Sequence, residues 1–213
     1  MKKLGILLSG RGSNFLAIAE SIRAGRIANA EISVVISNRA DAPGIVRARE
    51  LGLKAVCVSL KSGPSRGMAR EQHEAQVMAE LERHKVDLIC LAGYMRLLSP
   101  DFVRRFPQRI LNIHPSLLPA FPGMGAQKQA LAAGVKISGC TVHFVDDSLD
   151  GGPIVVQRAV PVLEDCCDDA AVSALSSRIL AEEHIAYTEA INIVLGGRFE
   201  VVGKVVRVFG SQK

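Results

Sequence analysis

The stretch VDLICLAGY, residues 86–94, is the clearest strand in the sequence and decides the fold class. Its apolar side chains do not alternate with polar ones, which is typical of a parallel strand covered by helices on both faces. Similar short aliphatic runs lie before and after it, separated by longer amphipathic stretches. These runs cover residues 4–9, 31–37, 55–60 and 109–114. The alternation predicts an α/β fold with a doubly wound, mostly parallel sheet.

The last third of the sequence follows a different pattern. Two further strands, expected at residues 139–147 and 153–162, are joined only by the short sequence SLDGG. A connection of this length cannot contain a helical crossover, so we expect an antiparallel extension of the sheet. A helix over about residues 171–195 and a terminal hairpin over 199–209 complete the expected elements.

Composition and charge limit the number of domains and the kinds of ligand that we expect. The chain has 213 residues, a formal charge of +5 and 48% hydrophobic residues, which suits one domain of the larger sort. Lysine and arginine are scattered among acidic residues, which argues against nucleic-acid binding. A small anionic ligand would suit the surplus of positive charge, although charge alone favours an ordinary solvated surface.

The cysteines and the apolar segments indicate a cytoplasmic protein. The five cysteines include no C-x-x-C pair, which favours free thiols in a reducing compartment and leaves a redox role of Cys166 and Cys167 open. The apolar run after Met1 is shorter than that of a signal peptide, and no run reaches the roughly 18 residues of a membrane span. We therefore expect no membrane partner.

A glycine loop follows the first expected strand. In LLSGRGSNF, Gly10 and Gly12 precede a helix that begins near Ser13 and Asn14. Glycines let an anion approach the backbone, and a helix N-terminus favours phosphate. The loop is not a full dinucleotide fingerprint because Phe15 replaces the third small residue, so a single phosphate fits better than a pyrophosphate. A plain tight turn with Ser13 or Asn14 as N-cap is the alternative that the spacing leaves open.

The strand over residues 109–114 ends in Asn-x-His. Residues i and i+2 share a face of a strand, so Asn112 and His114 point the same way, at the strand end where open parallel sheets bind ligands. An amide beside an imidazole can stabilise a developing oxyanion while the imidazole moves a proton. A histidine that is merely hydrogen-bonded at a strand end is the plainer interpretation.

A nearby carboxylate would favour the catalytic interpretation, because it stabilises and orients an imidazolium. Asp146, Asp147 and Asp150 follow the strand TVHFV, and Asp150 begins the sequence D-G-G-P. His143 on that strand could contribute as well. No serine or cysteine has an elbow context for covalent catalysis, and the five histidines lack the spacing of a metal site, so we expect no metal.

Five motifs, in order along the chain, resemble the phosphoribosylglycinamide formyltransferases, the folate-dependent transformylases of purine synthesis. They are SGRGSN (9–14), LAGYMRLLSP (91–100), LNIHPSLLPAFPG (111–123), TVHFVDDSLDGGP (141–153) and AEEH (181–184). The resemblance covers essentially the whole chain. It implies the formyltransferase fold, which is Rossmann-like, as one domain of residues 1–213. A mononucleotide-binding half would span about 1–105 and a catalytic and folate-binding half about 106–213.

The resemblance also implies roles for individual residues. Asn112, His114 and Asp150 match the catalytic trio of the family, and Glu183 matches an acid that contacts the substrate ribose. Residues that match the phosphate loop are Gly12, Ser13 and Asn14. Residues that match the lining of the folate site are Arg70, Met95, Arg96, Leu97 and Leu98, together with Asn112. Arg11, Gly125 and Gln127 depart from the residues that many relatives carry, which bears on the phosphate contacts.

The implied activity is transfer of the formyl group of 10-formyltetrahydrofolate, as co-substrate, to the amine of phosphoribosylglycinamide. The alternatives are formyltetrahydrofolate hydrolase, another formyltransferase such as the one acting on initiator aminoacyl-tRNA, and a non-catalytic mononucleotide-binding module. We expect the chain to lack room for the extra domain of the hydrolase or of the tRNA enzyme. Neither a monomer nor a homodimer is favoured by the sequence.

Overall fold

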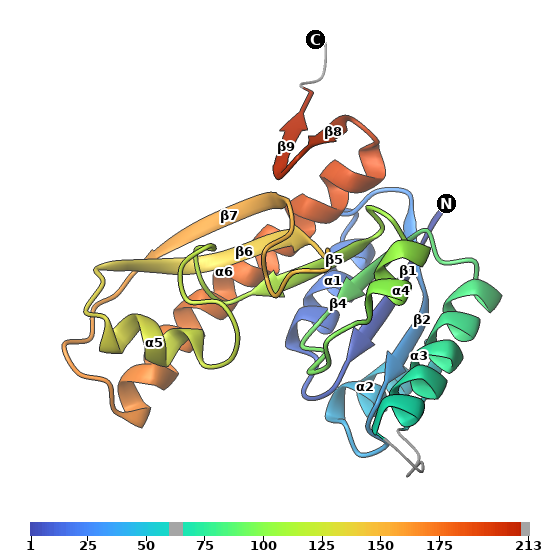
Figure 1. The fold of residues 1–213 in the computed structure, drawn as a ribbon, viewed down its shortest axis with the longest axis horizontal. Coiled ribbons are helices and arrows are strands. Elements are labelled where there is room, and N and C mark those ends of the chain that lie inside the picture. The colour runs from blue at the N-terminus through green and yellow to red at the C-terminus, as the bar shows by residue number, and fades with distance from the viewer. Residues whose placement is uncertain (60–65, 210–213) are drawn as a thin grey trace. The chain divides into compact units, whose positions relative to one another are not determined.

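The computed structural model describes residues 1–59 and 66–209, shown as a ribbon in Figure 1. The chain forms two compact units, residues Met1–Leu111 and Asn112–Lys213. Each unit has its own sheet strands and helices. Strand β5, which covers Ile110–His114, begins in the first unit and ends in the second.

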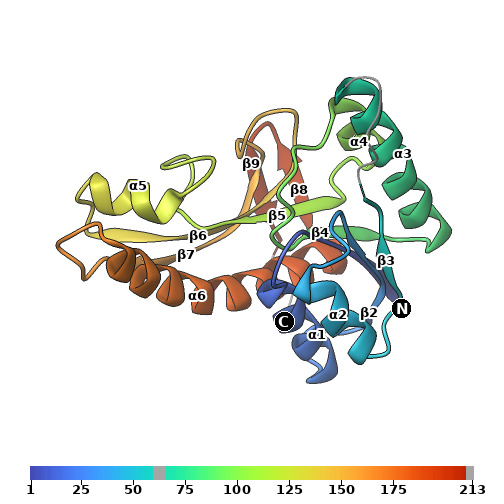
Figure 2. The same cartoon turned by 90° about the horizontal axis from the view of Figure 1, so that it is seen from below.

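The first unit contains parallel strands in the order β3-β2-β1-β4. Helices α1 and α2 cover one face of these strands, and α3 and α4 cover the other, as Figure 2 shows. Because both faces are covered, these strands are largely apolar, and all four residues of β4 are buried. The strands are β1 (Lys2–Leu8), β2 (Ala30–Ser37), β3 (Ala55–Cys57) and β4 (Leu88–Leu91). The helices are α1 (Ser13–Arg23), α2 (Pro43–Glu50), α3 (Arg66–Arg83) and α4 (Pro100–Arg105).

The second unit contains the expected antiparallel strands. β6 pairs antiparallel with β7, and β8 pairs antiparallel with β9, which also joins β7 in parallel. The long helix α6 packs against β6 and β7 and contacts α5. The elements are α5 (Ala126–Ala132), β6 (Ile137–Phe144), β7 (Ile154–Pro161), α6 (Asp169–Gly196), β8 (Phe199–Val202) and β9 (Val205–Val208). The predicted fold class is therefore confirmed.

Several element boundaries differ from those expected. β3 ends at Cys57 instead of residue 60, which lies outside the described residues. The segment SPDFVRRF forms a helix, because the Ser99 side chain accepts a hydrogen bond from the backbone N–H of Phe102 and Pro100 occupies the first turn. β6 begins earlier than expected, at Ile137, where it pairs with Pro161 at the end of β7.

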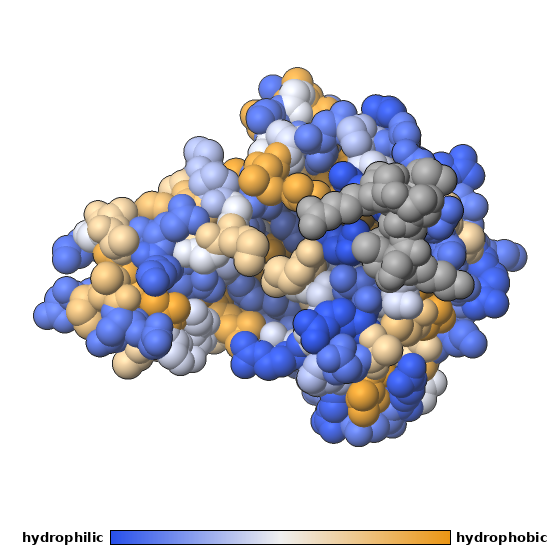
Figure 3. Space-filling view, turned by 60° about the horizontal axis from the view of Figure 1, so that its bottom comes forward, coloured by the Kyte–Doolittle hydropathy of each residue, from blue (hydrophilic) through white to orange (hydrophobic). Residues whose placement is uncertain are grey.

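The surface mixes hydrophilic and hydrophobic residues on the face seen in Figure 3. The large hydrophobic side chains that are most exposed include Met124, Met95 and Leu97. Across residues 1–59 and 66–209, none of the helices combines the length and the apolar character that a bilayer span requires.

Candidate active site

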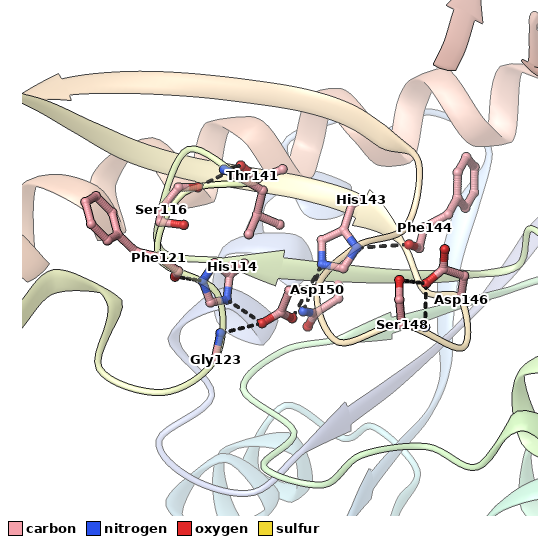
Figure 4. A network of polar contacts seen from close by, with 12 residues as sticks. His114, Ser116, Phe121, Gly123, Thr141, His143, Phe144, Asp146, Ser148 and Asp150 are labelled. Carbon is pink, nitrogen blue, oxygen red and sulfur yellow. Dashed lines mark hydrogen bonds and ion pairs between the residues drawn. The ribbon is translucent and has the colours of Figure 1, made fainter. Parts of the chain in front are cut away.

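The second unit brings Asn112, His114 and Asp150 together, as the sequence predicted. Figure 4 shows His114, His143 and Asp150 side by side. Asn112 and His114 lie at the end of β5, and Asp150 lies in the loop between β6 and β7. The Nδ1 atom of His114 is 3.4 Å from Oδ2 of Asp150. An amide, an imidazole and a carboxylate from distant parts of the sequence therefore form one cluster.

The partners of His114 define its protonation. Its Nε2 atom lies 2.9 Å from the backbone oxygen of Phe121. A carbonyl oxygen can only accept a hydrogen bond, so Nε2 carries a proton, and Nδ1 faces the Asp150 carboxylate. Asp150 is therefore placed to orient the His114 ring through Nδ1. His114 is 5% exposed, so little solvent competes for either ring nitrogen.

The carboxylate of Asp150 is held by the backbone as well as by histidine. Its Oδ2 atom accepts a hydrogen bond from the backbone N–H of Gly123 at 2.8 Å. Asp150 itself has φ of 50°, and Phe121, whose carbonyl contacts His114, has φ of 54°. Both values lie in the left-handed region that non-glycine residues rarely adopt, so two residues of this cluster carry backbone strain.

The two glycines after Asp150 let its loop turn sharply. A Cβ on Gly152 would lie 1.9 Å from the backbone oxygen of Phe144, and a Cβ on Gly151 would lie 2.4 Å from the Ser148 hydroxyl. Only glycine fits position 152 without moving backbone atoms. The D-G-G-P sequence therefore places Asp150 beside His114 through a close backbone approach, which is the use expected of its glycines.

His143 of β6 belongs to the same cluster and has a distinct role. Its Nδ1–H donates to the backbone oxygen of Phe144 at 2.9 Å, so its Nε2 has a lone pair when the ring is neutral. Burial lowers the pKa of His143, which keeps the ring neutral. The lone pair accepts a hydrogen bond from Nδ2 of Asn112 at 3.2 Å. His143 therefore fixes which end of the Asn112 amide faces it.

A second network supports the segment that carries Phe121. The Thr141 hydroxyl donates to the backbone oxygen of Ser116 at 2.7 Å and accepts from the backbone N–H of Leu118 at 3.0 Å. The Gln157 amide donates both to Thr141 and to the backbone oxygen of Leu118. Strands β6 and β7 thus fix the backbone that faces His114.

The glycine loop forms the start of α1 in the first unit. Gly12, with φ of 75°, is the N-cap of the helix, and no side chain caps it. The alternative in which Ser13 or Asn14 caps the helix is therefore wrong, because both residues lie inside the helix. Helix N-termini have backbone N–H groups without intrahelical acceptors, and these suit a phosphate. The neighbouring residue Arg11 is exposed.

The positions expected to line a folate site also lie in the first unit. Met95 and Leu97 expose 73% and 67% of their surface, and Arg96 and Leu98 are half-buried. Arg70 of α3 donates to the backbone oxygen of Leu97 at 3.0 Å and to Glu74. The structure therefore brings Arg70 to the segment 95–98, as the family pattern implied.

Glu183 lies in α6 and is 7% exposed. Its neighbour Glu182 is more exposed and forms an ion pair with Arg158. The helical pattern in the sequence did not choose between these two acids. Burial distinguishes them, because a carboxylate that is hidden from bulk water is the better candidate for a specific polar contact.

A family model described as "Formyl transferase" matches residues 2–191 of the chain. The chain belongs to the formyl transferase family.

Individual relatives agree with this assignment. The phosphoribosylglycinamide formyltransferase of Escherichia coli (strain K12) is 38% identical, over 92% of this chain and 88% of that protein. The crystal structure of glycinamide ribonucleotide transformylase 1 from Symbiobacterium toebii is 50% identical. It covers 99% of this chain and 95% of its own, with a TM-score of 0.91. The resemblance to phosphoribosylglycinamide formyltransferases is thus confirmed.

Some relatives are much longer than this chain. The trifunctional purine biosynthetic protein adenosine-3 of Drosophila melanogaster is 44% identical over 92% of this chain, which spans only 14% of that protein.

His143 is the residue of this formyl transferase whose role the sequence only suggested. It lies in the strand TVHFV among apolar residues, and a polar ring inside an apolar strand was the available signal. Its contact with Asn112 depends on which strands neighbour each other, which residue spacing does not reveal.

Within residues 1–59 and 66–209, the structure has no cluster of three or more histidine, cysteine or acidic side chains suited to a metal.

Proposed function

We propose that this formyl transferase moves the formyl group of 10-formyltetrahydrofolate to the amine of 5-phosphoribosylglycinamide, in de novo biosynthesis of the purine nucleotide IMP. The observation that carries the proposal is the cluster of Asn112, His114 and Asp150 in a chain of this family. The E. coli relative, which the chain matches over most of both lengths, has this activity in its name.

The proposed reaction needs an oxyanion site and a route for one proton. The neutral amine attacks the formyl carbon and forms a tetrahedral intermediate with a negatively charged oxygen. The bond from this carbon to the folate nitrogen then breaks, and the proton lost by the amine ends on that nitrogen. Hydrogen-bond donors aimed at the oxygen lower the barrier because the charge develops there.

Asn112 is suited to be one donor. Its Nδ2 atom has two hydrogens, and His143 accepts one of them. The second hydrogen can be donated to the formyl oxygen without loss of the first contact. The amide is therefore oriented before the substrate binds, which reduces the reorganisation needed in the transition state.

His114, in its imidazolium form, is the proposed second donor. Its Nδ1 faces Asp150, so the proton offered to the formyl oxygen would be the one on Nε2. In this structure Nε2–H donates to the backbone oxygen of Phe121. The formyl oxygen would then replace the Phe121 carbonyl. Asp150 stabilises the positive ring, and a positioned water or His114 itself carries the proton to the folate nitrogen.

The remaining residues would bind the two substrates. Gly12, Ser13 and Asn14 would hold the 5-phosphate at the start of α1. Glu183 would contact the ribose hydroxyl groups. Arg70 and the segment 95–98 would line the folate site, where two exposed apolar side chains suit the hydrophobic surface of a folate. In this assignment the half of about 1–105 binds the mononucleotide and carries Arg70 and residues 95–98 of the folate site, and the half of about 106–213 carries catalysis.

The test is the release of formyl from 10-formyltetrahydrofolate with and without phosphoribosylglycinamide. We expect formyl transfer that requires the glycinamide amine. Formate released equally fast without the acceptor would identify a hydrolase instead. Transfer only to initiator aminoacyl-tRNA would identify the tRNA enzyme, and no turnover with either acceptor would leave only a mononucleotide-binding protein.

A further inference from the structure

Glu74 of α3 is a buried carboxylate that the proposed reaction does not use. It is 6% exposed and lies on the side of α3 that faces residues 94–99. The backbone N–H of Ser99 donates to its Oε1 atom at 3.0 Å, and the Ser99 hydroxyl donates to Oε2 in a short contact. Arg70 Nε donates to Oε1 at 3.1 Å. One carboxylate therefore accepts three hydrogen bonds from two residues.

These contacts hold the end of the segment 95–98. Ser99 follows the segment directly, and its hydroxyl oxygen also accepts from the backbone N–H of Phe102 to begin α4. Arg70, which Glu74 orients, donates to the backbone oxygen of Leu97. Glu74 thus acts on the segment twice, directly through Ser99 and indirectly through Arg70.

The start of the segment is held separately. The backbone N–H of Met95 donates to the Ser9 hydroxyl at 2.9 Å, and the Tyr94 hydroxyl is 2.8 Å from Nε2 of His73. Burial raises the pKa of Tyr94 to about 12 and lowers the pKa of His73, so both groups are neutral in a poorly solvated environment. The backbone is therefore fixed at both ends, while the side chains of Met95 and Leu97 remain exposed.

A carboxylate suits the donors that meet at Glu74, because both of its oxygens accept. A glutamine can accept from Ser99 N–H and Arg70 only when its NH₂ group faces the Ser99 hydroxyl, which then has to turn its own proton away. A buried hydrogen bond to a charged group is also stronger than one between neutral groups. A change of Glu74 to glutamine therefore removes the ion pair with Arg70 and the hydrogen bond that the Ser99 hydroxyl donates.

We propose that Glu74 is a positioning residue that holds Ser99 and Arg70, and through them residues 95–98, in the conformation that binds folate. The proposal rests on the function proposed above. A binding segment that is ordered before the ligand arrives loses less conformational entropy on binding. Loss of Glu74 should therefore weaken folate binding and leave the chemical step nearly unchanged.

The experiment compares E74Q with E71Q, a matched change of an exposed glutamate on the same helix. For E74Q we expect the KM for 10-formyltetrahydrofolate and the Kd for tetrahydrofolate to rise about tenfold, with kcat within about threefold of wild type. The KM for phosphoribosylglycinamide and all constants of E71Q should stay at the wild-type values. Thermal unfolding of each variant establishes that it is folded.

A second variant covers the case in which E74Q does not fold. S99A keeps the backbone donor and loses the hydroxyl, so it should raise the same two constants by a smaller factor. Combined with E74Q it should add little, because both changes break one network. If wild type binds tetrahydrofolate and transfers formyl while E74Q or S99A behaves like E71Q, the role of Glu74 is refuted. If wild type does neither, the proposed function itself has failed.

Discussion

A side-chain amide can present its oxygen or its nitrogen to a substrate, and His143 determines which one Asn112 presents. Because the Nδ1–H of His143 is used by the Phe144 carbonyl, its Nε2 can only accept, and only the nitrogen end of the amide can face it. The low pKa that burial gives His143 maintains this arrangement, since protonation of Nε2 would reverse it. His143 thus orients the side chain that we propose as an oxyanion donor.

Two variants of His143 test this orientation. Asparagine can keep the donation to the Phe144 carbonyl but removes the acceptor for Asn112, so H143N should lower kcat about tenfold. Glutamine extends an oxygen toward the position of Nε2, so H143Q should recover part of that loss. Steady-state kinetics of both folded variants provides the measurement, and equal rates in the two would argue against an orienting role.

The charge of Asp150 can be tested apart from its shape. In D150N the side-chain oxygen can still accept from Gly123, but the support for an imidazolium at His114 is lost. We expect kcat to fall by at least about tenfold, since general acid catalysis contributes on this scale or more. D147N, a change of an exposed aspartate in the same loop, is the control and should retain full activity. Similar rates for the two variants would contradict the role of Asp150.

Much of this cluster could be predicted from local sequence. The alternation of a strand places Asn112 and His114 on one face, and the two glycines after Asp150 signal a sharp turn. The partner of Asn112 could not be predicted, because it lies 31 residues away on another strand. The contact of His114 with the Phe121 carbonyl was also hidden, since it depends on an unusual backbone angle at a non-glycine residue.

At the scale of elements, the start of α2 supports the glycine loop. The backbone N–H of Gly44 donates to the backbone oxygen of Gly10 at 3.0 Å. A Cβ on Gly44 would lie 2.9 Å from a methyl of Leu8 and 3.0 Å from the oxygen of Gly10. Residue spacing gives no sign of this close approach of α2 to the loop, so it is a finding of the structure.

The variant G44A should therefore push the loop away from α2. We expect the KM for phosphoribosylglycinamide to rise about tenfold while the KM for the folate stays constant. The reason is that G44A displaces the loop backbone that is proposed to bind the phosphate. The control is G196A, since a Cβ at that glycine meets no atom within 4 Å. An unchanged KM in a folded G44A protein would count against the phosphate site.

Helix ends show where sequence reasoning reaches its limit. α6 begins at Asp169 because the Asp168 side chain accepts from the backbone N–H of Ala171, and it ends where Gly197 adopts φ of 64°. Both signals are visible in the sequence, yet the apolar pattern alone placed the helix at 171–195. Capping residues therefore locate this helix more accurately than its hydrophobic stripe does.

At the scale of the whole molecule, four histidines with lowered pKa values make stability depend on pH. Burial is the main cause of the low pKa of His73, His84, His143 and His184. The unfolded chain, in which histidine has a pKa of about 6.5, then binds more protons than the folded chain at mildly acidic pH. The stabilisation from these neutral histidines is complete above the unfolded-state pKa of about 6.5. It is lost as the pH falls toward the lower pKa values of the same histidines in the folded chain.

Urea unfolding between pH 7.5 and 5 measures this dependence. We expect the midpoint urea concentration to fall over this range, which starts about one unit above the unfolded histidine pKa. His184, whose Nε2 is buried without a hydrogen-bond partner among the described residues, gives a direct check. H184N should show a shallower pH dependence than wild type, and an identical one would contradict this account.

Composition and residue spacing do not show the boundary between the two units, although the family resemblance implied two halves that meet near residue 105. The boundary falls between Leu111 and Asn112, inside β5, and the sequence ILNIH shows no change of composition there. Strand and helix patterns report local burial, whereas a unit boundary depends on how contacts distribute over the entire chain. The apolar runs therefore predicted the α/β class, but they contain no signal for this boundary.

The central claim is that Asn112 and His114 act on the formyl group, and the turnover number measures this most directly. We expect kcat of N112A and of H114A to fall by on the order of a hundredfold or more, which corresponds to roughly 3 kcal/mol for one oxyanion donor. Tetrahydrofolate binding should persist in both folded variants. Formyl transfer at nearly the wild-type kcat in both would contradict the account.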